Sequence, residues 1–544
     1  MRSTLCRKGV KSRAGKFVGW FSFLTLSGPV PKLSQMPSES APHTKRLTTR
    51  VVKGSLWTLA GQIAPLAVQM VSTPIVIRQL GAESYGALAL ILIIPQYIYF
   101  AELGMTVAST KFGSAAYFDG DPAREAKIIR TAALIALAGL TPVAAFLAFF
   151  SRDVSVLFSV PDHLLGETSI ALKLVAASLI PTLLGSVFNS PQLSRLRMDL
   201  NTFVTSGSRI AALIATPVAL HLGYGIVGAS FIILAAALVN LICHFIVATR
   251  LLPQLFGLTI DPGLLRPLIG FGVPMAFASA AIMAIANLDR GVLSALSSIR
   301  QLAYYSVAFT LANLLTLASS SLYQSLVPIF SQLQADNYAE QRNAVYSRTV
   351  RLAFVIMIPL IAIAGIGGET IITIFAGSEF AQEGTAPFHL LLIGVLVSVG
   401  AYVPSAAIVS TGRTGLLAKM YWLELAPYGA LLWLLISYFG AVGAAAAWST
   451  RVVLDALLLF FFARKYAGVR YSERHRGGMI VSAAVAVAPL ILYLLFGLSV
   501  VTGLAIAVLV LPLYALIVWR SVLEPMETDW LLSRIRSITR RKAD

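Results

Sequence analysis

The stretch IRQLGAESYGALALILIIPQYIYFAELGM, residues 77–105, decides the class of this chain. A short polar turn, residues 78–84, separates two long apolar segments, and the second segment carries a single carboxylate, Glu102. Soluble proteins rarely stay this apolar on both sides of one turn. A lipid bilayer favours such segments, because its core offers no water to backbone polar groups and a helix satisfies those groups internally. The stretch therefore predicts two membrane-spanning helices joined by a tight turn.

The composition of the whole chain points the same way. Of its 544 residues, 57% are hydrophobic and only 12% are charged, which is typical of a polytopic membrane protein. The two cysteines, Cys6 and Cys243, are too few and too far apart for a disulfide scaffold or a metal cluster. The net charge of +18 would suggest nucleic acid in a soluble protein. Here the basic residues lie between apolar segments, so membrane topology explains them and no nucleic-acid partner is expected.

Fourteen apolar segments come close to the ~20 residues that a membrane span needs. They cover residues 54–77, 85–109, 128–150, 168–190, 203–221, 225–248, 267–289, 302–328, 351–375, 387–410, 416–438, 440–462, 478–497 and 499–519. Several contain proline, which membrane helices tolerate and at which transporters bend. The predicted fold class is therefore an all-α polytopic membrane protein with about fourteen transmembrane helices.

The distribution of basic residues predicts the orientation of these segments. With the N-terminus in the cytoplasm, cytoplasmic regions hold 36 of the 42 Lys and Arg residues, opposite loops hold five, and Arg451 lies inside a predicted helix. Loops on the cytoplasmic side of a membrane are the ones enriched in Lys and Arg. Both ends of the chain are therefore predicted to be cytoplasmic.

An internal repeat predicts how the helices are grouped. Residues 77–80, IRQL, recur at 299–302, and GIVGA at 225–229 corresponds to GAVGA at 440–444. Six predicted helices separate the copies, and an even number gives both the same orientation, as in transporters with parallel repeats. The predicted organisation is a basic tail, two six-helix bundles, two additional helices and a second basic tail. These parts cover residues 1–46, 47–250, 251–465, 466–520 and 521–544.

The first tail is predicted to be disordered. Its apolar run at residues 17–30 mimics a signal peptide but lacks a convincing cleavage site. A start at Met36 is an equal alternative, so whether residues 1–35 belong to the working protein is left open.

The pattern LGxxxYGxxAL at residues 80–90, followed by Glu102-Leu103-Gly104, resembles the Wzx-type polysaccharide flippases of the MATE-like MOP exporter superfamily. The resemblance covers about residues 47–519. It implies a V-shaped pair of parallel six-helix bundles around a central cavity, followed by two further helices. It also implies a function, the flipping of a polyprenyl-diphosphate-linked oligosaccharide across the bacterial inner membrane for O-antigen, capsule or exopolysaccharide synthesis. Membrane lipids, a polysaccharide polymerase and a chain-length regulator are the implied partners.

Charged residues inside predicted spans are the candidates for substrate binding, because such charges are costly in a membrane and usually face a cavity or each other. Asp289 and Arg290 end the seventh predicted helix, in NLDRGVL, where the family commonly has an Asp-Arg pair. One interpretation places Arg290 in the cavity, attracting phosphate or sugar acid groups, with Asp289 orienting it. The other is an ion pair near the outer surface.

Two further pairs of charged residues are candidates. One pair lies within the second half of the repeat, and the other consists of equivalent positions in the two halves. Arg451 and Asp455 are four residues apart, hence on one helix face. They either neutralise each other, or Arg451 lines the cavity and releases Asp455 when an anion arrives. Glu424 corresponds to Arg209 in the repeat, so the two either face each other or lie near the cytoplasmic interface.

Glu102 is the candidate for ion coupling. Its carboxylate either pairs with a basic residue of a neighbouring helix or binds a coupling cation or proton. The chain has no GxxxxGK[ST], HExxH or GxSxG motif, and its six histidines show no metal-ligand spacing. No cofactor or metal is therefore expected, and the chain is predicted to be a transporter rather than an enzyme.

Three alternatives to an O-antigen-type flippase stay open. A cation-coupled multidrug or metabolite exporter of the same superfamily would use a carboxylate to bind its substrate. A peptidoglycan-precursor flippase would differ mainly in substrate. A membrane polysaccharide polymerase is less favoured, since neither a large catalytic loop nor an acidic donor-sugar motif is visible.

Overall fold

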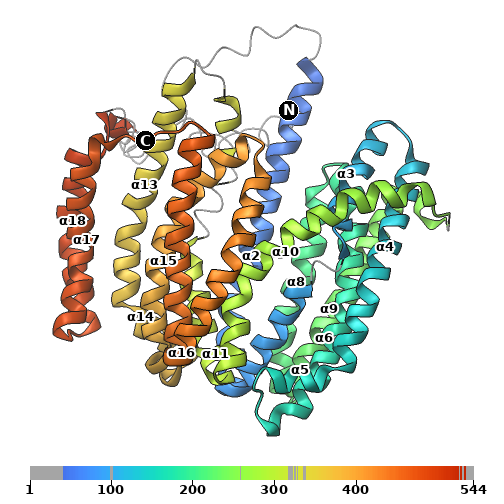
Figure 1. Cartoon of the computed structure of the whole chain (residues 1–544), viewed down its shortest axis with the longest axis horizontal. Helices are drawn as coiled ribbons and strands as arrows, with labels where there is room; N and C mark the ends of the chain where they lie inside the picture. The colour runs from blue at the N-terminus through green and yellow to red at the C-terminus, as the bar shows by residue number, and fades with distance from the viewer. Residues whose placement is uncertain are drawn as a thin grey trace, which may run out of the picture.

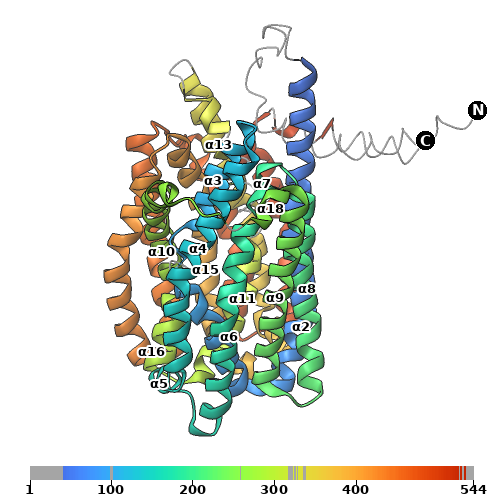
Figure 2. The ribbon, with the colours of Figure 1, turned by 90° about the vertical axis from the view of Figure 1, so that its right-hand side faces the viewer.

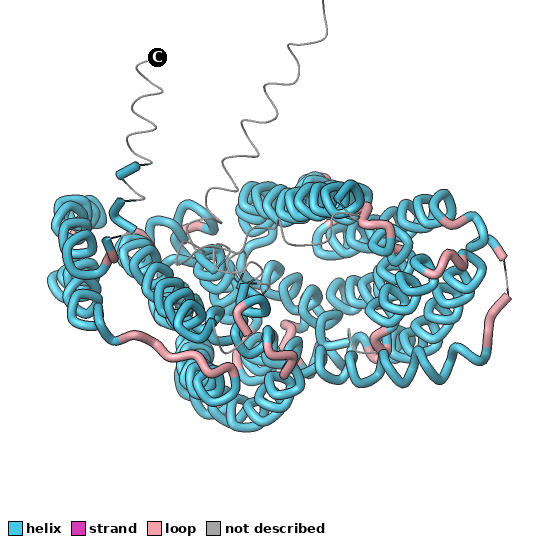
Figure 3. The backbone as a smooth tube through the Cα atoms, turned by 90° about the horizontal axis from the view of Figure 1, so that it is seen from above, coloured by secondary structure: helices cyan, strands magenta, loops and turns pink. Residues whose placement is uncertain are grey.

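A computed structural model describes residues 41–98, 102–257, 259–316 and 338–525, together with residues 323, 326–327, 329–334, 527–529 and 532–533. The described residues form helices, turns and bends without a β-strand, which confirms the predicted all-α class. Residues 1–40 and 534–544, which make up most of the two predicted tails, lie outside this description. Most of the helices run roughly along one axis and are seen end-on from above (Figure 3).

The helices from α2 to α9 pack on one another and are called here the N-terminal group (Figure 1). They are α2 (Ala41–Ile98), α3 (Met105–Phe118), α4 (Pro122–Phe149), α5 (Ser151–Leu157), α6 (Asp162–Phe188), α7 (Ser190–Ser194), α8 (Met198–His221) and α9 (Gly225–Leu251). Figure 2 shows α6, α9 and α8 side by side, and α4 packs against α6. Asp121 caps α4 by accepting a hydrogen bond from the backbone N–H of Arg124 at 2.9 Å.

The following helices form a second packed set, the C-terminal group. They are α10 (Leu265–Leu296), α11 (Ile299–Asn313) with the 3-10 turn η5 (Leu314–Thr316), α13 (Ala339–Ile366), α14 (Gly368–Ala376), α15 (Ser378–Ser410) and α16 (Thr414–Tyr466). Two more helices, α17 (Arg476–Phe496) and α18 (Val500–Ile517), pack against α13 at one edge of the molecule (Figure 1). The boundaries predicted for the bundles remain a prediction, because α10 also contacts α2, α3 and α4.

Eleven described helices are long and apolar enough to cross a membrane. Two of them contain a non-helical glycine: Gly81 in α2 has φ 73° and ψ 177°, and Gly440 in α16 has φ 53° and ψ −128°. A positive φ is the left-handed region that favours glycine, so each long helix is two shorter ones joined at a kink. In α11 the described helix ends at Asn313, and part of the predicted span 302–328 lies outside the described residues. The total of fourteen spans therefore stays a prediction.

The second predicted span, residues 85–109, is wrong as one continuous helix. The described part of α2 ends at Ile98, and α3 begins at Met105. Between them Leu103 and Gly104 have φ values of 56° and 69°. A Cβ atom on Gly104 would lie 2.2 Å from the carbonyl oxygen of Gly272 in α10, so this close backbone approach needs glycine. Hydropathy could not reveal the break, because the residues on both sides of it are equally apolar.

Buried apolar residues show where the two groups are joined. The largest core contains residues of both groups, for example Ile77 and Leu90 with Ile299 and Leu302. We call this the joined end; it lies around α5, α11 and α14, at the bottom of Figure 1. At the opposite end, the separated end, the described residues form two distinct cores. One contains residues of the N-terminal group from Met105 onward together with Leu268 at the start of α10, and the other contains residues between 326 and 469 of the C-terminal group.

Candidate substrate cavity

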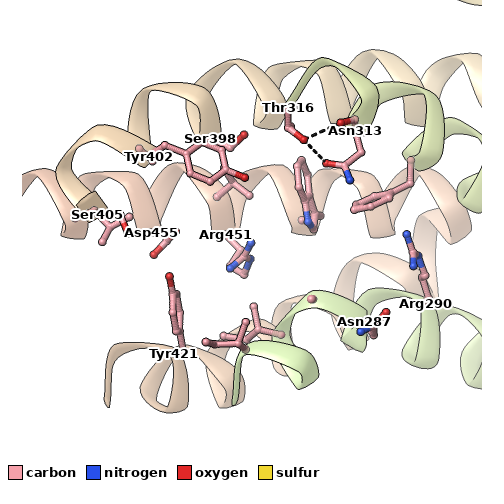
Figure 4. A pocket seen from close by; sticks show the side chains of 18 residues that line it. Asn287, Arg290, Asn313, Thr316, Ser398, Tyr402, Ser405, Tyr421, Arg451 and Asp455 are labelled. Carbon is pink, nitrogen blue, oxygen red and sulfur yellow. Dashed lines mark hydrogen bonds between the residues drawn. The ribbon is translucent and has the colours of Figure 1, made fainter. Parts of the chain in front are cut away.

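A cavity of about 460 Å³ lies among α10, α11, α15 and α16 of the C-terminal group (Figure 4). Its volume is in the range of small-molecule and cofactor sites. Its polar and aromatic lining residues are Asn287, Arg290, Phe309, Asn313, Thr316, Ser398, Tyr402, Ser405, Tyr421, Trp448, Arg451 and Asp455. Three of the six residues predicted to belong to a substrate cavity, Arg290, Arg451 and Asp455, therefore line one space.

Arg290 reaches this cavity from inside a helix, not from a helix end. The structure corrects the expected position of the Asp289-Arg290 pair, because α10 continues to Leu296. The guanidinium carbon of Arg290 lies 4.4 Å from the centre of the Phe309 ring, a cation–π contact. Phe309 in turn packs edge-on against Trp448, with ring centres 5.4 Å apart. Aromatic contacts thus hold one face of Arg290 and leave its donors available to a ligand.

The Asp289 side chain does not pair with the guanidinium group of Arg290 but forms a hydrogen bond with a residue of another helix. Its side chain is fully buried, and one carboxylate oxygen accepts a hydrogen bond from the Tyr305 hydroxyl of α11. No ion pair between Asp289 and Arg290 is found within the described residues. The Asp289 carboxylate therefore contacts the backbone of Arg290 and not its guanidinium group, and it ties α10 to α11 through Tyr305.

Arg451 finds its partner across the kink at Gly440. Its Nη1 atom lies 3.7 Å from Oε2 of Glu424, and both side chains are largely buried. The first half of α16 carries Glu424 and the second half carries Arg451, so this contact places the two halves side by side and antiparallel. The guanidinium group also lies 5.4 Å from the centre of the Tyr428 ring. Asp455, the partner suggested by helical spacing, lines the cavity one turn further along without a described ion pair to Arg451.

Two predicted residues lie elsewhere. Arg209 on α8 is exposed and donates a hydrogen bond to the Gln69 side chain at 3.3 Å, so it does not face Glu424. Glu102 lies in the break before α3, is only 2% exposed, and accepts a hydrogen bond from the Thr106 hydroxyl at 2.6 Å. No basic partner of Glu102 is present among the described side chains.

Sequence reasoning missed most of the uncharged lining. Asn287 precedes Arg290 by three residues and so shares its helix face. An amide side chain on the same helix face as Arg290, inside an apolar segment, could have indicated that Asn287 also lines the cavity. Asn313, Ser398 and Ser405 are single polar residues in apolar helices, and they gave no sign of which of them would converge. Tertiary packing alone brings them to one space.

The lining combines groups of three chemical kinds. Two guanidinium groups suit the bidentate binding of carboxylates and phosphates. Amides and hydroxyls offer hydrogen bonds, as Thr316 and Asn313 do to each other at 2.9 Å (Figure 4). Phe309, Tyr402, Tyr421 and Trp448 offer broad apolar faces with polar edges. Among the described residues no three His, Cys, Asp or Glu side chains group closely enough to hold a metal ion.

This fold defines an all-helical, polytopic membrane protein with a polar and aromatic cavity inside one helix group. The chain belongs to the family described as polysaccharide biosynthesis protein, which matches residues 51–334, more than half of its length. It is 23% identical over 413 residues to a Shigella flexneri protein provisionally named O-antigen transporter, and the match covers 75% of this chain and 96% of that protein. The resemblance seen in the sequence is thus confirmed at the level of this polysaccharide biosynthesis family.

Solved structures confirm the fold. The inward closed structure of the lipid II flippase MurJ matches with a TM-score of 0.69 at 13% identity, over 87% of this chain and all of that one. An inward-facing multidrug resistance MATE transporter of the MOP superfamily matches with a TM-score of 0.65 at 12% identity. That match covers 74% of this chain and 94% of the transporter. At these identities the likeness concerns the arrangement of the helices.

Proposed function

We propose that the protein flips a polyprenyl-diphosphate-linked oligosaccharide from the cytoplasmic to the outer leaflet of the bacterial inner membrane, for surface polysaccharide synthesis. The observation that carries the proposal is the convergence of Arg290 and Arg451 on one cavity of a protein from a polysaccharide biosynthesis family. The guanidinium groups would bind acidic groups of the glycan or its diphosphate. The amides and aromatic rings beside them would contact the sugar rings.

The arrangement of cores supports alternating access as the mechanism. The two helix groups share the largest core at the joined end. At the separated end the start of α10 packs into the core of the N-terminal group, and the core around residues 326–469 is distinct from it. Rocking of one group against the other would expose the cavity to each side in turn, while the lipid tail of the substrate stays in the bilayer. Glu102 remains the candidate for coupling this motion to a cation or proton. Arg209 and Asp289 take no direct part in this scheme.

The predicted distribution of loop charges supports a cytoplasmic position for the separated end. α2 begins at this end, and the segment after α18 lies there beside Arg348 and Arg351 of α13. Both termini would then be cytoplasmic. A polymerase and its chain-length regulator would receive the flipped unit on the outer side.

The leaflet in which the lipid-linked glycan accumulates tests this function directly. In a strain that lacks the protein, glycolipids are labelled by a reagent that reaches only the outer surface. Completed units protected from the reagent support the flippase. Single units already exposed to the reagent contradict it and point to a polymerase.

Replacing Arg290 with alanine tests the cavity. A hydrogen bond to a charged group contributes about 1.5–3 kcal/mol, so we expect surface glycan to fall by about tenfold or more. Arg476→Ala is the control, because Arg476 is exposed and pairs at 3.6 Å only with the exposed Glu473. Unchanged surface glycan in a folded Arg290→Ala protein would show that the cavity is not the substrate site.

The alternative of a cation-coupled exporter has one observation in its favour. Three carboxylates, Asp289, Glu424 and Asp455, lie on or beside the cavity. A cationic substrate would use them, and deletion of the gene would then change tolerance of cationic drugs and leave the glycolipid unchanged.

A further inference from the structure

The ion pair between Arg451 and Glu424 is held loosely for a buried pair. The 3.7 Å between its nitrogen and oxygen exceeds the 2.7–2.9 Å of a charge-assisted hydrogen bond. Glu424 has two buried oxygens that accept no hydrogen bond from an N–H or hydroxyl donor among the described residues; its hydrogen-bonding neighbour there is the carboxyl group of Asp455. A buried acceptor without a donor is costly. The pair is therefore easily exchanged for a better one.

A second carboxyl group competes for the same guanidinium. Asp455 lies one helical turn after Arg451, shares a hydrogen bond with the Glu424 carboxyl group, interacts electrostatically with Arg451, and has one buried oxygen, Oδ1, without a partner in the described structure. Two carboxyl groups thus share one guanidinium group. Carboxylates at short range disfavour the state in which both are ionised. The remaining groups around them are Tyr421 and Tyr428 on α16, Tyr402 on α15, and Asp289 and Arg290 on α10.

Arg451 connects this acid pair to the cavity. Its side chain lines the cavity, whereas Glu424 contacts Arg451 without lining that space. An anion that enters the cavity can therefore reach the guanidinium group and compete with Glu424 for its N–H donors. A phosphate or carboxylate with two oxygens can satisfy the guanidinium donors that Glu424 leaves poorly used.

We propose that Glu424 occupies Arg451 in place of the substrate's acidic group, and that a bound anion displaces it. The proposal rests on the proposed function, because it assigns Arg451 to an anionic part of the flipped molecule. While Arg451 is paired, the hydrogen-bonded Glu424 and Asp455 carboxyl groups share one proton and carry one negative charge. Once the anion has taken Arg451, the two carboxyl groups take up a second proton from solvent and become neutral. Glu424 is thus a positioning residue that keeps the empty site closed to weakly bound anions and links anion binding to proton uptake.

Proton uptake on anion binding tests this inference on the full-length protein. Inorganic pyrophosphate is titrated into the detergent-solubilised protein at pH 7 in two buffers with different heats of ionisation. The difference in measured heat gives the number of protons taken up per anion. We expect about one proton for the unchanged protein, and weaker binding by at least about tenfold for Arg451→Ala. Binding without proton uptake, or no binding of pyrophosphate, would overturn the proposal.

The variant Glu424→Gln distinguishes two roles of Glu424: a competitor that occupies Arg451 in place of the substrate anion, or a structural partner that holds Arg451 in position. Removing the competing charge should tighten pyrophosphate binding by roughly tenfold and abolish proton uptake. Weaker binding would show that Glu424 holds Arg451 in place and would contradict the proposal. Glu473→Gln is the matched control, because Glu473 pairs with Arg476 on the exposed surface. If Glu424→Gln does not fold, Glu424→Asp and the measurement on the unchanged protein still decide the question.

Export in cells distinguishes the two proposals. Normal proton-linked pyrophosphate binding with the leaflet location of glycolipid unaltered by gene deletion would count against the flippase alone. Impaired export of glycan in the deletion strain with proton-free pyrophosphate binding would count against the exchange on Arg451 alone.

Discussion

At the scale of single residues, Gly272 in α10 faces the break before α3 at a separation that excludes a side chain. A Cβ atom on Gly272 would lie 2.4 Å from the carbonyl oxygen of Leu103, whereas one on Gly270 would meet nothing within 4 Å. We expect Gly272→Ala to lower the free energy of unfolding by about 1–3 kcal/mol, because the two backbones must separate. Thermal unfolding in detergent, followed by tryptophan fluorescence, measures the change.

The same helix provides the control. Gly270→Ala adds the same methyl group where space is open, and alanine favours the helix by about 0.5–1 kcal/mol over glycine. The Gly270→Ala variant should therefore melt at the same temperature as the unchanged protein or slightly higher. Equal melting temperatures for the two variants would contradict the close approach of α10 to Leu103.

Charged residues in apolar segments were identifiable from sequence, but their partners were not. Arg290, Arg451 and Asp455 were identifiable because a charged side chain inside a membrane span is energetically costly and usually functional. All three line the cavity. Helical spacing paired Arg451 with Asp455, yet the structure pairs it with Glu424 across the kink at Gly440. A four-residue spacing contributes only about 0.2–0.5 kcal/mol, so tertiary packing decides the partner.

At the scale of secondary-structure elements, a buried network ties α13 to the segment that follows α18. Arg351 of α13 donates to Glu527 at 2.6 Å and to Glu524 at 3.0 Å, and Arg348 also contacts both carboxylates. Arg351 and Glu527 are almost fully buried. Arg351→Met should lower the free energy of unfolding by about 3–5 kcal/mol, because it leaves a buried carboxylate without one of its partners. Hydrogen exchange should show faster opening of α17 and α18.

An exposed pair offers the comparison for this network. Arg476→Met removes an arginine that lies 3.6 Å from Glu473 with both side chains mostly exposed, and such pairs contribute about 0–1 kcal/mol. Exchange rates in α17 that rise equally in both variants would argue that the network does not anchor these helices.

The pH dependence of the same contact follows from Glu524. Burial raises the pKa of this carboxyl, but hydrogen bonds and charge from Arg351 and Arg348 outweigh that effect and hold its pKa below the usual range. A group with a lowered pKa in the folded state stabilises the fold above its unfolded-state pKa and loses that contribution as the pH falls through the folded value. The protection factors of α17 and α18, which compare the exchange rate with that of an unfolded chain at the same pH, should therefore fall below the ordinary pKa of glutamate. Protection factors that stay constant from pH 7 to pH 3 would contradict this.

Hydropathy predicted membrane segments well but not where helices break. Segments such as 225–248 and 478–497 correspond closely to α9 and α17, because length and apolarity are what a bilayer selects. Hydropathy did not predict the break at Leu103 and Gly104, because this break depends on contact with Gly272 in a distant helix. Hydropathy also did not predict that α10 contacts both α3 and α4 in one group and α16 in the other, because these contacts too are between distant segments.

At the scale of the whole molecule, polar contacts reinforce the shared core of the joined end. Arg300 at the start of α11 donates to Glu83 at 2.8 Å, and His163 of α6 lies 3.3 Å from the same carboxylate. Arg78 donates to the carbonyl oxygen of Ile374 in α14 at 2.7 Å. The Glu83–Arg300 and Arg78–Ile374 contacts join the N-terminal to the C-terminal group. Opening this end to the other side of the membrane must break them together with the core beneath.

A cross-link at this end should therefore stop transport. Cys6 and Cys243 are first replaced with serine, and cysteines are introduced at Glu83 and Arg300. The ion pair is partly exposed and contributes only about 0–1 kcal/mol, so the cysteine pair alone should transport at near the normal rate. A reducible bifunctional thiol reagent long enough to replace the ion pair should then block glycan export, and reduction should restore it. The same reagent on cysteines at Glu473 and Arg476 bridges one turn of a single segment and should leave export unchanged. Continued export with the Glu83–Arg300 link intact would mean that the joined end stays closed throughout transport, and the two groups would then have to pass the glycan without separating there.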